Sequence, residues 1–155
     1  MDPTCTVIVH LDTSVLVDAL TGPRRSYEPL ERTVAAGHVL AITTLALYEW
    51  LRGPRTREEL SDQEALLPAA EARDFGPAEA RRAAHLYSSL TRPRGRDMNI
   101  AIAACAIEHG ARLWTLNPGD FRDMSGLSMY EPVPTKRSGR RGQWPVRMQH
   151  AARQP

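Results

Sequence analysis

A short apolar run over residues 7–11 ends directly on Asp12, Thr13 and Ser14, and this junction constrains the fold more than any other feature of the chain. The run has the length and composition of a buried strand, and apolar residues at helical spacing begin immediately after it. In an open parallel sheet, ligands bind at the carboxyl ends of the strands. A carboxylate that follows such a strand is therefore predicted to point into a cleft.

The alternation of short strands and helices continues along the chain. Further strands are predicted over residues 39–43, 112–116 and 128–133, with residues 72–75 as an ambiguous short segment. Helices are predicted over residues 14–20, 30–36, 45–52, 56–67, 77–90 and 98–108. Because parallel neighbours need crossover connections, this order predicts an α/β fold in which helices surround a central, mainly parallel sheet.

The length of 155 residues fits a single folded domain, which we assign to residues 1–132. Residues 133–155 form a basic C-terminal tail that is predicted to be disordered, because it carries six basic residues, no acidic residue and no clear periodicity. A solvated basic end is the favoured interpretation of this tail. An arm that binds RNA or a protein partner is the alternative.

Several classes of protein are disfavoured by the sequence. No apolar run approaches the ~20 residues of a membrane span, and the N-terminus lacks the basic segment of a signal peptide. The two cysteines, Cys5 and Cys105, show no metal-thiolate spacing and fit a reducing compartment. The expected location is the cytoplasm, with no membrane partner.

Acidic and amide residues recur near the ends of other predicted elements. These residues are Glu49, Asp97, Asn99, Asn117 and Asp120. The helix around Glu49 is expected to be capped by Thr44 and to be buried over much of its surface, because both neighbours of Glu49 are aromatic. A glutamate in such surroundings needs water, a cation or a polar partner. Taken alone, Asp12 also fits a helix cap, which Thr13 or Ser14 could equally supply, and Asp120 also fits a turn.

Carboxylates gathered in one cleft repel each other and stay ionised together only when a cation compensates their charge. Oxygen ligands without histidine or cysteine favour Mg²⁺ or Mn²⁺ over zinc. Such an ion activates water and stabilises the charge that develops on phosphorus during phosphodiester hydrolysis. The residues therefore predict metal-dependent phosphoryl chemistry, without naming the substrate.

Four segments of the chain together resemble the PIN-domain ribonucleases and, more narrowly, the VapC toxins of bacterial toxin–antitoxin pairs. They are LDTSVLVD (11–18), YEWLRG (48–53), IAACA (102–106) followed by HG (109–110), and LWTLNPGDF (113–121) followed by GL (126–127). The resemblance covers about residues 6–132 and implies a three-layer α/β/α fold. It also implies an endoribonuclease that uses Mg²⁺ or Mn²⁺, forms a homodimer and is silenced by a cognate VapB-type antitoxin. Structured RNA, above all tRNA, is the implied substrate.

The resemblance also implies a set of site residues. The catalytic and metal-binding positions are Asp12, Glu49, Asn99, Asn117 and Asp120, supported by Thr13, Ser14 and Thr115. Asp12 corresponds to the metal ligand after the first strand, and Glu49 to the second carboxylate. Asp120 is the charged member of the last motif.

The third position departs from the pattern of the family, in which an aspartate stands three residues before the Ile-Ala-Ala of its helix. Here that position holds Asn99. A match shifted by two residues selects Asp97 but loses the spacing to residues 109–110. Side chains two residues apart on a helix differ by about 200° in direction, so only one of them can face the cleft. Asn99 is preferred, with Asp97 as a residue at the helix start. The uncharged amide of Asn99 predicts weak metal binding and low or absent activity, as an Asp-to-Asn change made to tolerate a toxic enzyme would produce. A natural variant and the match through Asp97 are the alternatives.

Arg52, Arg94 and Arg96 are predicted to bind RNA, because arginines beside an acidic site supply the phosphate contacts that carboxylates cannot. Solvated loop charge is the alternative for each of them. Two other functions stay open. A phosphatase with an aspartate nucleophile is disfavoured, because Ser14 stands where a second aspartate is usual. A non-catalytic PIN-like module that binds RNA or protein is favoured by Asn99.

Overall fold

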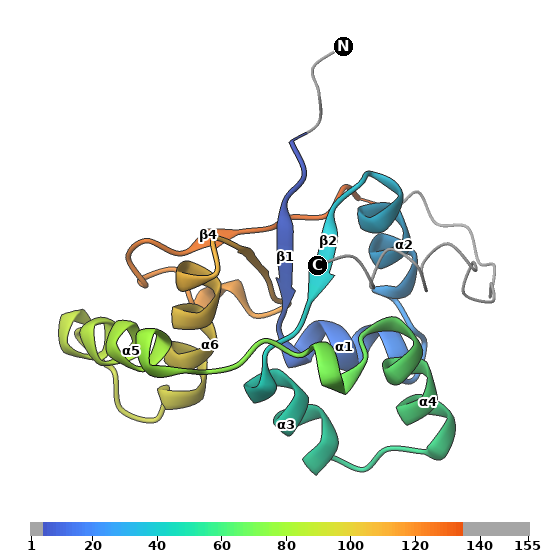
Figure 1. The fold of residues 1–155 in the computed structure, drawn as a ribbon, viewed down its shortest axis with the longest axis horizontal. Coiled ribbons are helices and arrows are strands. Elements are labelled where there is room, and N and C mark those ends of the chain that lie inside the picture. Colours follow the sequence, from blue (N-terminus) through green and yellow to red (C-terminus); the bar gives the residue numbers. More distant parts are fainter. Residues whose placement is uncertain (1–4, 135–155) are drawn as a thin grey trace.

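Four short parallel strands form the centre of the fold, in the order β2-β1-β3-β4 (Figure 1). The structure is a computed structural model that describes residues 5–134. The strands are β1 Ile8–Leu11, β2 Val39–Ala41, β3 Arg112–Trp114 and β4 Ser128–Met129. In register, Val9 of β1 faces Leu40 on one side and Arg112 on the other. Because every pairing of these strands is parallel, their carboxyl ends share one edge of the sheet.

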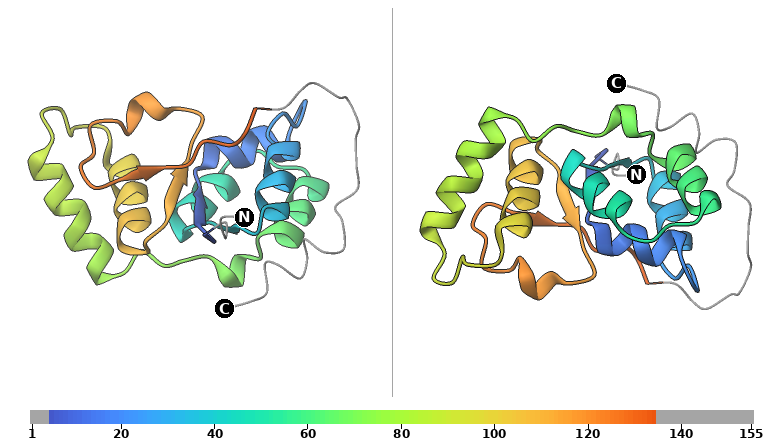
Figure 2. Two further views of the ribbon diagram at one scale, coloured as in Figure 1. Left: turned by 90° about the horizontal axis from the view of Figure 1, so that it is seen from above. Right: turned by 90° about the horizontal axis from the view of Figure 1, so that it is seen from below.

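Six helices flank this sheet. They are α1 Thr13–Leu20, α2 Tyr27–Ala35, α3 Thr44–Arg52, α4 Arg57–Leu66, α5 Pro77–Ser89 and α6 Asp97–Glu108, with the short 3-10 helices η1 Ala69–Glu71 and η2 Pro118–Asp120. Figure 2 shows α5 and α6 on one side of the molecule and α1 to α4 on the other. The predicted α/β architecture, in three layers around a parallel sheet, is confirmed.

The core divides into two apolar clusters because successive residues of a strand point to opposite faces of a sheet. Val9 and Leu11 of β1 are buried in the cluster shared with α1, α2, α3 and α4. Leu113 of β3 belongs to the second cluster, together with α6 and the segment around Phe121. The apolar helix α6 supplies most of the second cluster, which explains why nearly all of its residues are hydrophobic.

The structure selects one of the predicted caps for α1 and shifts the predicted cap of α3 by one residue. Asp12 itself caps α1, since its side chain accepts a hydrogen bond from the Thr13 N–H, so neither Thr13 nor Ser14 is the cap. Likewise Thr43, rather than Thr44, caps α3 by accepting from the Ala46 N–H at 3.1 Å. Asp12 directly follows β1, whereas only Ile42 lies between the end of β2 and Thr43, so each strand passes into its helix with almost no connecting loop.

Two further predictions needed correction. Residues 72–75 form no strand of their own, and only an isolated parallel bridge joins Arg73 to Thr43. Helix α2 begins at Tyr27, three residues earlier than predicted, with Pro29 in its first turn, where proline is tolerated. The predicted tail over residues 133–155 lies, beyond residue 134, outside the described residues. Between residues 5 and 134, no helix is long and apolar enough to cross a membrane.

Candidate active site

The candidate site lies at the carboxyl edge of the sheet. Asp12 follows β1 and Thr115 follows β3, and the pairing of Leu11 with Trp114 makes these two residues neighbours. Figure 1 shows that the first turns of α1 and α6 lie at this same edge, near the start of α3. The parallel topology therefore gathers segments that are more than a hundred residues apart in the sequence.

Asp12 is buried, with 6% of its surface exposed, and is held by three donors. Its carboxylate accepts hydrogen bonds from the Thr13 N–H at 2.9 Å, the Ser14 hydroxyl at 2.9 Å and the Thr115 hydroxyl at 2.7 Å. These donors fix the direction of the carboxylate and satisfy acceptors that would otherwise be costly to bury.

Thr13 connects this carboxylate to a second one. Its hydroxyl donates to Glu49 Oε2 at 2.7 Å, while its backbone N–H donates to Asp12. The other oxygen of Glu49 lies 3.7 Å from Arg52 Nη2, and the Glu49 side chain is 21% exposed. The structure thus brings Asp12 and Glu49 to the two sides of a single threonine.

The surroundings of Glu49 differ from those expected. Helix α3 is not largely buried, because Tyr48 and Leu51, which flank Glu49 on the helix, are 54% and 51% exposed. What holds Glu49 is therefore the Thr13 hydroxyl and the nearby Arg52, and not an apolar environment. The Arg52 guanidinium also lies over the Tyr48 ring, 5.5 Å from its centroid.

Both candidates for the third position lie in the first turn of α6. Asn99 is half-buried, whereas Asp97 is exposed at the first residue of the helix. Among the described residues, the Asn99 amide makes no hydrogen bond. Asp97 is placed favourably at the positive end of the helix dipole, and the choice of Asn99 as the site residue stays a prediction.

The last motif lies on the exposed segment after β3. The Asn117 N–H donates to the Thr115 hydroxyl at 3.0 Å, and the Leu116 N–H donates to the Ser14 hydroxyl at 3.1 Å. Both hydroxyls that hold Asp12 are therefore themselves held by the backbone of this segment. Asp120 is exposed in η2, and the structure shows no contact between its carboxylate and Asp12 or Glu49.

Arg96 is engaged within the protein. Its guanidinium donates to both carboxylate oxygens of Asp123, at 2.6 and 2.8 Å, and to the Asp120 carbonyl oxygen at 2.7 Å. The hydrogen bond from Arg96 lowers the pKa of the Asp123 carboxyl below its ordinary value. This contact ties the start of α6 to the turn that carries Asp120. Of the three predicted RNA-binding arginines, only Arg94 is both exposed and without a polar partner among the described residues.

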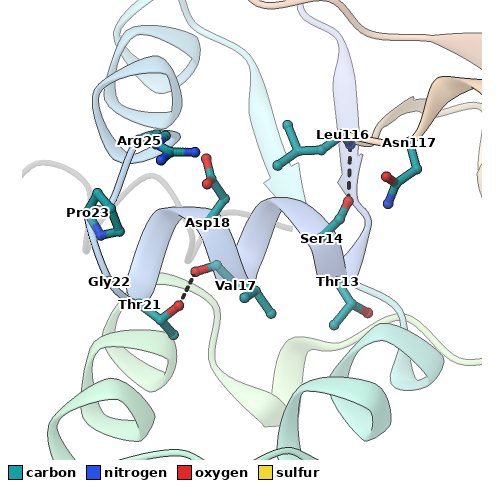
Figure 3. Close-up of a pocket in the computed structure, with 10 residues that line it drawn as sticks. All are labelled: Thr13, Ser14, Val17, Asp18, Thr21, Gly22, Pro23, Arg25, Leu116 and Asn117. Atoms are coloured by element: carbon teal, nitrogen blue, oxygen red, sulfur yellow. Dashed lines mark hydrogen bonds between the residues drawn. The ribbon is translucent and has the colours of Figure 1, made fainter.

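An open groove of about 510 Å³ runs along α1, from Ser14 and Asn117 at one end to Arg25 at the other (Figure 3). Asp18 also lines it, on the side of Arg25, and its carboxylate accepts a hydrogen bond from the Ser26 hydroxyl at 2.6 Å. Sequence reasoning missed this groove. The one feature of the sequence that could have indicated the groove is Asp18, a polar residue one helical turn after Ser14.

The ligand atoms that these side chains offer are of the type that a hard divalent cation prefers. Asp12, Glu49 and Asn99 all offer oxygen ligands, which Mg²⁺ and Mn²⁺ prefer. However, within residues 5–134 no three His, Cys, Asp or Glu side chains lie close enough together to form a metal centre.

Comparisons with known proteins agree with this geometry. The sequence profile of the PIN domain matches residues 9–127. Similar solved structures include VapBC2 from Rickettsia felis bound to a DNA fragment from its promoter, with a TM-score of 0.65 and 23% identity over 80% of this chain and 98% of that chain. DNA-bound VapBC from Salmonella typhimurium has a TM-score of 0.66 and 16% identity, covering 81% and 98% of the two chains.

A third similar structure is FitAcB from Neisseria gonorrhoeae, with a TM-score of 0.56 and 18% identity over 80% of this chain and 97% of that chain. At these identities the likeness concerns the fold. A comparison with curated proteins gives no significant match.

Proposed function

The chain belongs to the PIN domain family, and from this premise we propose that it is a metal-dependent endoribonuclease toxin of the VapC type. The observation that carries the proposal is the pair of carboxylates, Asp12 and Glu49, joined through Thr13 at the carboxyl edge of the sheet. Two carboxylates at this edge, supported by three hydroxyl-bearing side chains, suit phosphodiester hydrolysis better than binding alone.

Each residue has a distinct part in this proposal. Asp12, Glu49 and Asn99 would hold Mg²⁺ or Mn²⁺, with Asn117 and Asp120 at the open side. The ion, when bound, supplies an activated water and neutralises charge on the phosphate. Hydrogen bonds from Thr13 and from the hydroxyls at positions 14 and 115 keep the carboxylates aimed, as supporting residues do around metal ligands.

The proposed substrate is structured RNA, with tRNA first. Arg94 and Arg52 lie on the segments that carry Asn99 and Glu49, where they would contact phosphates. The proposed partner is a VapB-type antitoxin, which the VapBC and FitAcB structures among the similar folds support. An acidic edge is electrostatically complementary to an arginine from such a partner. The proposal includes that the protein forms a homodimer and acts in the cytoplasm.

The test is cleavage of total tRNA by the full chain with Mg²⁺ or Mn²⁺. We expect Glu49→Gln and Asp12→Ala to abolish cleavage, and Asn99→Asp to raise it at least tenfold at limiting metal, because a carboxylate restores the missing charge. Asp97→Asn is the matched control and should leave the rate unchanged. Circular dichroism verifies that each variant is folded. Cleavage that survives both Asp12→Ala and Glu49→Gln would reject the metal mechanism.

A second candidate is a non-catalytic PIN-like module that binds RNA or protein. Asn99 favours it, because the third acidic position is absent from the site. This candidate predicts that RNA binds without being cut even in the Asn99→Asp variant.

A further inference from the structure

We propose that the groove along α1 binds the RNA strand on one side of the scissile phosphate, and that Arg25 contacts a neighbouring phosphate of that strand. This inference rests on the proposed function and adds to it a substrate-binding site outside the carboxylate pair. Three features carry it: the continuity of the groove with the site, the absence of a polar partner for the Arg25 side chain among the described residues, and the chemistry of the other residues that line the groove.

The groove starts at the candidate active site itself. Ser14 lines the groove, and its hydroxyl is one of the three donors to Asp12. Leu116 and Asn117 form the opposite wall at this end, and Figure 3 shows the Asn117 side chain next to the start of α1. A strand whose scissile phosphate lies at Asp12 can therefore continue into the groove without crossing another element.

Arg25 closes the far end. It is the one cationic side chain among the described residues that line the groove. It is exposed and makes no ion pair or hydrogen bond with its side chain in the described part of the chain, whereas its neighbour Arg24 pairs with Asp62 at 2.9 Å. Helix α1 has eight residues, so it spans about 12 Å, which places Arg25 beyond the scissile phosphate itself.

The rest of the groove suits the sugar and base rather than a phosphate. The Asp18 carboxylate would repel a phosphate but accepts hydrogen bonds from donors such as a ribose hydroxyl or an exocyclic amine. Leu116, which is 45% exposed, and the half-buried Val17 provide apolar surface for a ring. The groove thus offers a cation for a phosphate and, toward Ser14, an acceptor and apolar surface for a sugar and base. The groove is open along its length, as a strand requires.

The experiment measures binding of a single-stranded oligoribonucleotide, and of total tRNA, to the full chain without divalent metal over a series of salt concentrations. We expect Arg25→Gln to weaken binding roughly three- to tenfold and to lower the salt slope by about one, because one phosphate contact is lost. Arg81→Gln is the matched control. Arg81 is an exposed arginine on α5, also without a polar partner among the described residues, and far from the groove in sequence and fold.

The cleavage assay separates this inference from the proposed function. Arg25→Gln should raise the KM for tRNA and leave kcat unchanged, while Glu49→Gln abolishes cleavage and leaves RNA binding intact. If Arg25→Gln binds RNA with the affinity and salt slope of Arg81→Gln, the groove assignment is overturned and the nuclease stands. The assignment is also overturned if the substitution weakens only the binding of an antitoxin peptide. If no variant cuts RNA but Arg25→Gln still weakens binding, the nuclease proposal fails and the groove stands.

Discussion

At the scale of single residues, Thr13 is the residue that links the two carboxylates of the candidate site. It donates one hydrogen bond to each carboxylate of the proposed metal pair, through its N–H to Asp12 and through its hydroxyl to Glu49. The backbone donor survives any substitution except proline, but the hydroxyl survives only in serine. The Thr13 hydroxyl is the one hydrogen-bond donor to the Glu49 carboxylate among the described residues, and the nearby Arg52 adds only a longer ion pair.

Thr13→Val tests this dependence because valine keeps the shape and removes the hydroxyl. We expect the metal affinity and the cleavage rate to fall about tenfold, and the free energy of unfolding to fall by about 1 kcal/mol for the lost hydrogen bond. Thr13→Ser, which keeps the hydroxyl, should restore both properties. Metal titration and urea unfolding are the measurements, and a Val variant with wild-type metal affinity would contradict the role.

At the scale of elements, the start of α6 is fixed to the turn at residues 118–123 by the contacts of Arg96. The guanidinium bridges Asp123 and the carbonyl of Asp120, so the turn that carries Asp120 is held at the start of the helix that carries Asn99. Arg96 is thus a positioning residue for this part of the site.

Arg96→Gln should weaken metal binding several-fold while costing less than about 1 kcal/mol of folding stability, as expected for an ion pair that is partly exposed. Arg82→Gln is the control, because it breaks a different ion pair of α6, that of Arg82 Nε with Glu108 at 2.6 Å. Calorimetric titration with metal measures the metal affinity of both variants. Equal metal affinities in the two variants would show that Arg96 has no effect on the site.

The same elements show what the sequence could predict. The strand that ends on Asp12 and the apolar pattern of α6 are local signals. They were sufficient to predict the parallel α/β fold and the location of the candidate site at the carboxyl edge of the sheet. The pairing of Arg96 with Asp123, 27 residues away, depends on how the turn after β3 packs on α6. The groove depends on the packing of α1 against the segment after β3. The ion pair leaves no local pattern, and the groove leaves only one polar residue on α1, Asp18, so neither could be predicted.

At the scale of the whole molecule, a buried histidine links folding to pH. His10 lies in the middle of β1, is 1% exposed, and has no hydrogen-bond partner for either ring nitrogen among the described residues. Burial lowers the pKa of His10 to about 3, and the charges of His109 and Arg73 act in the same direction. The rings of His10 and His109 lie 5.1 Å apart, and His109 Nε2 contacts Glu79 at 2.9 Å.

Folding stability should therefore decrease in acid. Between pH 6.5 and about 3 the unfolded chain binds a proton at His10 that the folded chain does not, so stability is complete above pH 6.5 and declines below it, by up to about 1.4 kcal/mol per pH unit. Urea unfolding at pH 7.5 and pH 5 measures the loss. His10→Leu should flatten this dependence, and His38→Gln, at a half-buried histidine, should not. An unchanged slope in His10→Leu would contradict the assignment.

The hydrogen bonds around Asp12 also bear on how such an enzyme can lose its activity during evolution. An amide at position 12 would direct an N–H at the Ser14 and Thr115 hydroxyls, both of which already accept a backbone N–H, so the fold would suffer along with the chemistry. An amide at position 99 disturbs no hydrogen bond within residues 5–134. An amide is therefore less costly to the hydrogen bonds of the fold at position 99, where this sequence carries asparagine, than at position 12.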